Sequence, residues 1–251
     1  MVVQHNMAAS NANRQLGIST NTLSKSTEKL SSGYRINRAA DDAAGLSISE
    51  KMRSQIRGLN KASSNAQDGI STIQTAEGAL NEAHSILQRM NELATQSAND
   101  TNTTADRTAV QSEVNALTNE LSRIASTSQF NTQNLLDGTF TGKNLQVGAL
   151  ENQKITISIG TMNAKALGVD SLDVKSFTKA GSAMTLIQKA ISKVSGQRSD
   201  LGALQNRLEH TVNNLDNISE NTQTAESRIR DTDMASEMVQ YSATSIIQQA
   251  G

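Results

Sequence analysis

The chain has 251 residues, enough for one large domain or two small ones, and it contains neither cysteine nor proline. The lack of cysteine excludes disulfides, thiolate metal sites and cysteine nucleophiles. The 23 Lys and Arg and the 24 Asp and Glu give a formal net charge of −1 with no basic stripe, which argues against a dedicated nucleic-acid binder. With three Phe, two Tyr and no Trp, the chain either stays disordered or buries narrow apolar stripes between long helices.

The start of the chain carries neither a membrane span nor the pattern of a cleaved secretory signal. Residues 1–13 hold no Lys or Arg and no continuous apolar stretch, and apolar runs elsewhere are only a few residues long. We therefore expect no membrane contact. Two destinations stay open: the protein remains inside the cell, or it leaves by a route that cleaves no signal.

A first helix is predicted to end at Ser31-Ser32-Gly33, where the glycine is available for a left-handed cap. Its apolar stripe has one leucine per heptad, at Leu16, Leu23 and Leu30, which is too little to hold a helix alone. Asp41 or Asp42 then offers an N-cap to a second helix.

The second helix carries a heptad seam, which indicates coiled-coil-like packing. The seam positions are Gly45, Ile48, Met52, Gln55, Leu59, Ala62, Ala66, Gly69, Ile73, Ala76, Leu80, Ala83, Leu87, Met90 and Ala94. A polar turn over residues 99–104 separates it from a shorter seam at Val110, Val114, Leu117, Leu121 and Ile124.

The period changes from helical to alternating over residues 131–178. Residues 154–159 read KITISI, which alternates by two, and Leu145 and Val147 precede them across the turn-forming Glu151-Asn152. We expect one or two small hairpins here, placed at one end of the helices.

A second long seam runs from Ala180 to Ala250 and softens to Thr and Ser after Ile218, so its distal part is expected to pack differently. The helices before and after the β segment must run antiparallel for their seams to meet. The predicted packing residues are Leu59, Ile73, Leu80 and Leu87 on one helix and Leu201, Leu204, Leu208 and Leu215 on the other.

Both ends of the chain are uncharged, since residues 1–13 and 238–251 contain no Asp, Glu, Lys or Arg. Ordering such ends in a lone chain would cost entropy without enough burial to offset it. We therefore expect residues 1–30 and the C-terminal end to be disordered in a monomer and to become helical inside an assembly.

Several segments closely resemble those of bacterial flagellins. Residues 30–46 read LSSGYRINRAADDAAGL, which is similar to the N-terminal signature of that family. The other matching strings are QDGIS (67–71), TAEGALNE (75–82), ELATQSAN (92–99), SQFN (128–131), RSDLGALQNR (198–207) and AESRIRDTDMA (225–235).

The resemblance implies a mainly α fold, with a long antiparallel helical coiled-coil rod and a small β-hairpin region. Residues 1–40 and 233–251 would belong to the filament-core domain and residues 41–232 to the rod, with hairpins at about 131–178 and no inserted outer domain. Family members usually continue beyond the segment that matches Gln248-Gln249-Ala250-Gly251, so the core helix is expected to be truncated here.

The resemblance also implies a function and partners. The chain would polymerise with copies of itself into the extracellular flagellar filament, after export without a cleaved signal peptide, and would meet a flagellar export chaperone. A hook–filament junction protein of the same helical type is the alternative. Residues Gln88, Arg89, Leu93 and Glu113 fall on positions that family members use to bind the vertebrate innate receptor Toll-like receptor 5.

No catalytic constellation is predicted, so a helical hydrolase is the weakest alternative. His5, His84 and His210 are far apart and none has a partner at metal-ligand spacing. The pair Asp41-Asp42 is expected to cap a helix, and the glycines of 196–202 lack the Lys-Ser/Thr that a phosphate loop needs. No metal or cofactor is therefore expected.

Overall fold

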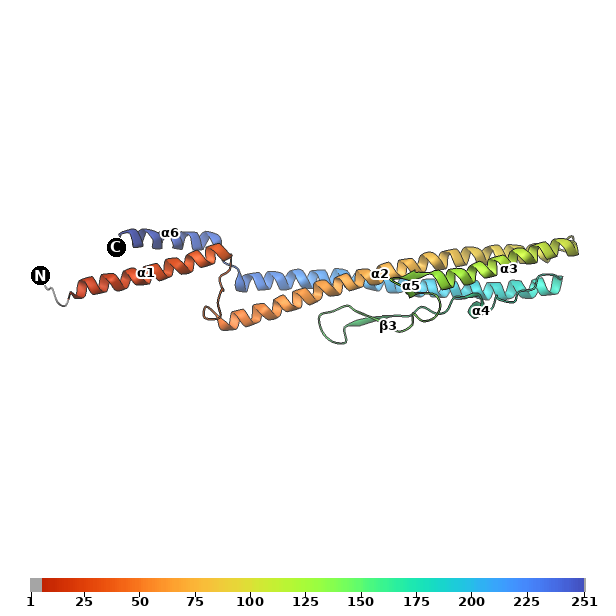
Figure 1. Cartoon of the computed structure of the whole chain (residues 1–251), viewed down its shortest axis with the longest axis horizontal. Coiled ribbons are helices and arrows are strands. Elements are labelled where there is room, and N and C mark those ends of the chain that lie inside the picture. The colour runs from red at the N-terminus through yellow and green to blue at the C-terminus, as the bar shows by residue number, and fades with distance from the viewer. Residues whose placement is uncertain (1–5, 251) are drawn as a thin grey trace. The chain divides into compact units, whose positions relative to one another are not determined.

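The computed structural model describes residues 6–250, so His5 lies outside the described part of the chain. Its elements in chain order are α1 (Met7–Ser32), α2 (Ala43–Ser97), α3 (Thr104–Thr127), β1 (Gln129–Phe130), β2 (Gln133–Asn134), β3 (Lys143–Gln146), β4 (Lys154–Ile157), α4 (Ala164–Leu167), α5 (Phe177–Arg230) and α6 (Met234–Ala250). The predicted fold class is confirmed: long helices dominate, α2 and α5 run antiparallel, and the strands form two small hairpins (Figure 1).

The described chain falls into two compact units. One holds Leu59–Asp216, and the other joins the residues up to Gly58 to those from Asn217 onward. These units do not follow the predicted borders at 40/41 and 232/233, although the helices do break at 33–42 and 231–233. The predicted borders concern the assembled filament and stay a prediction.

The start of α2 shows which of two adjacent carboxylates is the cap. Asp42 accepts a hydrogen bond from the N–H of Gly45 at 2.9 Å, as an N-cap does. Asp41 instead accepts from the N–H groups of Asn37 and Arg38 at 3.2 and 2.9 Å. The bond from the Arg38 N–H is the main cause that lowers the pKa of Asp41. At the end of α1, Gly33 has φ +76° and donates to the Lys29 carbonyl, which is the predicted left-handed cap.

The seam of α2 is continuously buried within the unit Leu59–Asp216. From Ala66 to Ala94 its positions pack in one core with those of α5 and α3, and Leu59 and Ala62 form a separate small cluster with Leu215; Ile48, before this unit, is 46% exposed. The core residues of α5 are Ala180, Ala183, Ile187, Ala190, Val194, Leu201 and Leu208. Helix α3 adds Val110, Val114 and Leu121, so α2 is covered on two sides.

The register of α2 against α5 follows from three side-chain contacts. Ser63 donates to Asp216 at 3.0 Å, Glu77 pairs with Arg198 at 3.6 Å, and Thr95 meets Met184 at 3.3 Å. Leu59 accordingly clusters with Leu215.

The same register corrects the predicted partners of Leu80 and Leu87. It places Leu87 level with Ala190, and Leu80 level with residues near Gln197, rather than with Leu201 to Leu215. All four predicted α2 leucines and isoleucines are buried, as are Leu201, Leu208 and Leu215, whereas Leu204 is only partly buried.

The β region forms two hairpins, but it lies along the side of the helices and not at their end. Leu145 of β3 packs so closely on Gly69 that a Cβ there would overlap its side chain, and Asn65 donates to the carbonyl of Gln146 at 3.1 Å. Both contacts are on α2, far from its end at Ser97. The helical pattern of the sequence could not predict this position, because a glycine is the only sequence feature of α2 where β3 packs.

Local details explain each hairpin. In β3–β4, Gln146 pairs with Lys154, and the alternating residues Ile155 and Ile157 are buried as predicted. The first hairpin begins at Gln129, two residues before the expected border, and turns through Asn131 and Thr132, which both have positive φ. Two such residues make a type I′ turn. The short helix α4 was not predicted from the sequence.

In the second unit, α1 and α6 lie side by side. Their facing sides are mainly polar: Lys29 pairs with Glu237 at 3.5 Å, and Gln248 donates to Thr20 at 3.4 Å. Ser26 and Thr244 are the most buried side chains of the two helices in the described residues. The leucines of α1 are half-buried or exposed, so this pair has no apolar core of its own.

Candidate interaction surface

Helix α6 presents its apolar side chains to solvent. Val239, Ile246 and Ile247 are 71, 66 and 59% exposed. Together with Ala243 they form what we call the α6 stripe. Val239, Ala243 and Ile247 of this stripe line a shallow groove. Val239, Ala243 and Ile246 lie on the side of the helix opposite to Glu237 and Gln248, which face α1. The stripe contains the predicted seam positions Val239, Ala243 and Ile246, and within residues 6–250 Val239 and Ile246 are left exposed.

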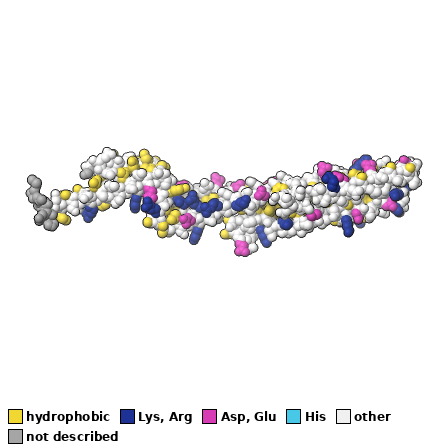
Figure 2. Space-filling view, in the orientation of Figure 1, with side chains coloured by type: hydrophobic (Ala, Val, Ile, Leu, Met, Phe, Trp, Pro, Cys, Tyr) yellow, Lys and Arg dark blue, Asp and Glu magenta, His cyan; other side chains and the backbone are white. Residues whose placement is uncertain are grey.

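Helix α1 adds further exposed apolar side chains. Met7 is 73% and Ile18 53% exposed, and Leu16 is also exposed. Figure 2 shows hydrophobic side chains gathered over the region of α1 and α6. Exposed apolar patches usually mark an interaction site.

The chemistry of α6 suits packing against copies of the same chain. Residues 238–250 carry no charge, so identical helices can approach without repulsion between like charges. Hydrophobic burial between copies would supply the core that the α1–α6 pair lacks.

A second exposed surface, on α2 and α3, centres on Arg89. Its Nε and Nη2 atoms donate to one carboxylate oxygen of Glu113 at 3.0 and 2.9 Å, and Nη1 donates to Glu92 at 3.2 Å. The bond with Glu113 is the main cause that raises the pKa of Arg89. Because the side chains are about half exposed, the two pairs add little stability, but they fix the direction of the guanidinium.

The structure places Leu93 away from this surface. Its side chain is 1% exposed and belongs to the core, because α3 covers the flank of α2 on which it lies. Gln88 and Arg89 are exposed, and Gln88 lies 3.1 Å from the ring of His84. Three of the four predicted receptor residues therefore lie on an exposed surface. Leu93 is buried and can contribute to this surface only by packing beneath it.

Sequence reasoning missed two features of these surfaces. Glu92, the second partner of Arg89, stands three residues further along α2, and this spacing on a helix could have indicated it. The guanidinium groups of Arg53 and Arg230 both lie over the ring of Tyr34, and the only signal in the sequence was one aromatic residue in a chain with few.

The described residues contain no group of three His, Asp or Glu side chains placed to hold a metal ion. Among the helices of that same part of the chain, none is long and apolar enough to cross a membrane. The features that remain are a packed helical body and a terminal helix pair with uncovered apolar sides. These features are those of the class of helical structural subunits that pack against other chains.

Comparison with known proteins agrees with this class. Residues 3–141 match the bacterial flagellin N-terminal helical region, and residues 184–251 match the bacterial flagellin C-terminal helical region. The chain is 55% identical over 252 residues to a flagellin of Halalkalibacterium halodurans, covering 100% of this chain and 93% of that one. It is 47% identical to a flagellin of Bacillus subtilis, with the same coverage.

Solved structures give the same result. The crystal structure of Bacillus cereus flagellin is 32% identical with a TM-score of 0.53, over 61% of this chain and 88% of that one. A putative flagellar hook-associated protein from Vibrio parahaemolyticus, 14% identical with a TM-score of 0.65 over 76% of this chain and 100% of that one, shares the fold.

The chain belongs to the bacterial flagellin family. It is a structural subunit of the flagellar filament and not an enzyme, and it polymerises with itself in the extracellular part of the flagellum. It is a short form without a large variable domain, because the chain from β1 to the end of α4 is a single short stretch of hairpins and loops.

Proposed function

We propose that this flagellin is, in addition, a ligand of vertebrate Toll-like receptor 5, and that the receptor contacts Gln88, Arg89 and Glu113. The observation that carries the proposal is the exposed Arg89, held in one orientation by Glu113 and Glu92. Arginine suits the centre of an interface because it combines a long stem with a forked set of donors. Pre-orientation lowers the entropy that binding would otherwise cost.

The test is binding of the purified monomer to the receptor's extracellular domain. Arg89→Ala should weaken binding by about tenfold or more, as expected for a central residue. Glu113→Ala should weaken it less, because it acts partly by releasing Arg89. Arg123→Ala is a matched control, since Arg123 makes a comparable exposed pair with Glu120 on α3. If both variants bind as tightly as the parent, the receptor surface is wrong.

Receptor binding should depend on whether the protein is a monomer or part of a filament. We propose that polymerisation covers the surface around Arg89, so that the monomer is the form the receptor binds. Intact filaments and monomer at equal subunit concentration should differ strongly in receptor binding. Equal binding would contradict this part of the proposal.

We propose that the chain forms long filaments alone, rather than acting as a hook–filament junction protein. Identity of 47–55% over the whole chain to flagellins supports this choice, whereas the likeness to the putative hook-associated protein is one of fold. Electron microscopy of the purified protein decides: long filaments support the proposal, and capped or short oligomers alone would favour the junction.

We further propose export without a cleaved signal peptide, with a flagellar export chaperone that covers the uncharged end of the chain before export. The exposed α6 stripe supports a chaperone role, because it would otherwise promote early assembly. Mass spectrometry of filament protein should find the N-terminus intact. A chaperone complex should form with the parent chain and fail with Val239→Asp.

A further inference from the structure

The turn between β3 and β4 is held in one conformation by the side chains on either side of it. The side-chain amide of Gln146 donates to the carbonyls of Gly148 and Leu150, at 2.9 and 2.6 Å. From the other side of the turn, the side-chain oxygen of Gln153 accepts a hydrogen bond from the N–H of Leu150 at 3.0 Å. Ala149 packs on the small apolar cluster shared by α2 and α5. The turn is therefore fixed both within the hairpin and against the helices.

This fixed turn presents one apolar and one charged side chain to solvent. Leu150 is 68% exposed, and the neighbouring Glu151 is also exposed. We call these two residues the hairpin knob. A single exposed leucine is common on a protein surface and needs no partner. Here, however, the backbone that carries it is already ordered, so covering the side chain would cost little conformational entropy. The hairpin knob is thus suited to enter a groove on another molecule.

A groove of about 520 Å³ lies where β3 begins, at the opposite end of the hairpin from the knob. We call it the hairpin groove. It is lined by α2, the first hairpin and β3, with Asp68, Phe130, Phe140, Lys143 and Leu145 among its residues. Phe140 is 9% exposed, and Phe130 and Leu145 are partly buried. The groove therefore offers an apolar wall to an incoming side chain.

The charges of the hairpin knob and the hairpin groove are complementary. Lys143 is exposed, with its ammonium 5.8 Å from the centre of the Phe140 ring. Neither Lys143 nor Glu151 forms an ion pair with any of residues 6–250. Asp68 is the other charged residue of the groove, and the exposed Lys154 follows the knob on the hairpin. Each of the two surfaces thus offers one cation and one anion to the other.

A single chain cannot bring these surfaces together, because Lys143 and Leu150 lie at opposite ends of the hairpin, about 15–20 Å apart. We propose that the hairpin knob of one subunit enters the hairpin groove of a neighbouring copy in the filament. Leu150 packs there against Phe130 and Phe140, and Glu151 lies beside Lys143. Burial of the leucine supplies attraction, and the charge pair sets the orientation. A contact between two different surfaces of identical chains can repeat from copy to copy, as a filament requires.

The first test exchanges the two charges and follows filament growth from parent seeds. Lys143→Glu places two carboxylates at each contact and Glu151→Lys places two ammonium groups there, so each change should slow elongation by about tenfold or more. The double variant restores an opposite pair with reversed polarity and should elongate within about threefold of the parent rate. Parent growth rates in both single variants, or slow growth of the double variant, would overturn the proposal.

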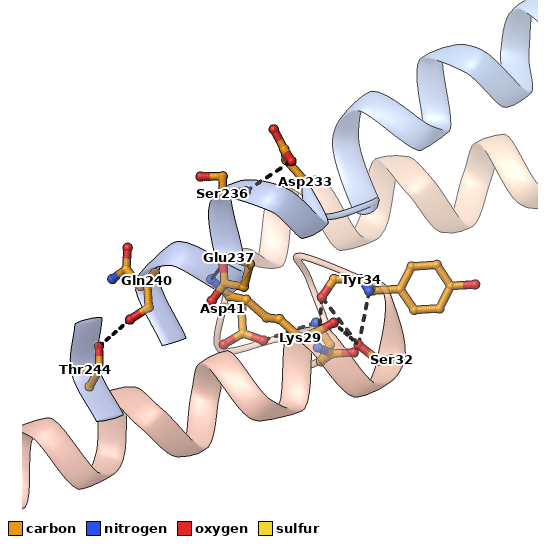
Figure 3. Close-up of polar contacts among 10 residues, drawn as sticks. Lys29, Ser32, Tyr34, Asp41, Asp233, Ser236, Glu237, Gln240 and Thr244 are labelled. Atoms are coloured by element: carbon orange, nitrogen blue, oxygen red, sulfur yellow. Dashed lines mark hydrogen bonds and ion pairs between the residues drawn. The ribbon is translucent and has the colours of Figure 1, made fainter. Parts of the chain in front are cut away.

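A matched control separates the charge pair from the total charge. Glu151→Lys combined with Lys189→Glu has the same net charge as the double variant, but Lys189 is an exposed residue of α5 outside the groove. This combination should stay as slow as Glu151→Lys alone, and recovery of growth would overturn the pairing. Because the substituted side chains are exposed, every variant should melt like the parent monomer. The terminal helices are not altered, since their contacts, such as that of Lys29 with Glu237 in Figure 3, belong to the other unit.

The second test asks whether the knob and the groove touch. The chain has no cysteine, so introduced cysteines are its only thiols. A disulfide forms only when the two Cα atoms come within about 7 Å of each other. Filaments grown from an equal mixture of Lys143→Cys and Glu151→Cys subunits should give covalent dimers on oxidation, and filaments of either variant alone should give none. Mixed filaments that give no dimers would overturn the proposal.

Discussion

At the scale of single residues, the seam of α2 is expected to carry much of the subunit's stability. Leu80 is fully buried among residues of α5, so Leu80→Ala should lower the free energy of unfolding by about 2–5 kcal/mol. Leu186→Ala is a matched control, because Leu186 is 41% exposed on α5 and should cost about 1 kcal/mol or less. Urea unfolding of the monomer measures both. Similar losses would mean that Leu80 does not lie in a packed core.

The same scale separates Leu93 from its neighbours. The family resemblance groups Leu93 with Arg89 and Glu113 as a receptor residue. Because Leu93 is buried, we expect its side chain to stabilise the core instead. Leu93→Ala should destabilise the monomer by about 2–5 kcal/mol, whereas Arg89→Ala should leave stability nearly unchanged. Thermal melting of the two variants tests this difference. A stable Leu93→Ala variant with weak receptor binding would return Leu93 to the receptor surface.

At the scale of elements, α3 begins with a capping box that makes its start sensitive to acid. Thr103 accepts from the N–H of Asp106, and the Asp106 carboxylate accepts from the N–H and hydroxyl of Thr103. The bond from the Thr103 hydroxyl is the main cause that lowers the pKa of Asp106. A carboxyl whose pKa is lower in the folded state stabilises it above the unfolded value and loses this contribution as the pH falls through the folded value.

The expected result is a smaller loss of stability in acid when the carboxylate is absent. Asp106→Asn should lower the melting temperature at pH 7 and reduce its fall between pH 7 and about pH 3. Asp100→Asn, which removes an exposed carboxylate paired with Arg107, serves as the control. If the melting temperature of Asp106→Asn falls in acid as much as that of the parent, the capping box does not contribute to the pH dependence of stability.

A second prediction at this scale concerns the order of the two terminal helices in the monomer. Although α1 and α6 pair in the structure, their contact is polar and their apolar sides are exposed. In a dilute monomer, residues up to about 30 should exchange their amide hydrogens quickly, and filaments should protect them strongly. Strong protection in the monomer would contradict the idea that assembly orders these helices.

Heptad periodicity predicted the helices, their antiparallel sense and most of the core, because seams such as Leu59 to Ala94 leave only one way to bury them. Heptad periodicity does not indicate which side of α2 a third helix covers, so the burial of Leu93 under α3 was not predicted. The place of β3 beside Gly69 was also missed, since a close approach is set by the backbone of another element. Stacking of Arg53 and Arg230 on Tyr34 joins residues nearly 200 positions apart, which no local pattern reports.

At the scale of the whole molecule, the α6 stripe should decide whether subunits polymerise. Val239 is 71% exposed and has no role in the packing of α6 on α1. Val239→Asp should therefore leave the melting of the monomer unchanged. In a filament every subunit carries the substitution, so each contact would bury an unpaired carboxylate, at a cost of about several kcal/mol per subunit.

Filament growth from parent seeds measures this effect. Val239→Asp should fail to elongate at concentrations at which the parent forms long filaments, while Val239→Ile, which keeps an apolar side chain of the same branching, should grow like the parent. Because the charge acts only where the stripe is covered, the two variants should be indistinguishable as monomers. If Val239→Asp elongates normally, the stripe faces solvent in the filament, and α1 with Met7 and Ile18 becomes the apolar contact between subunits.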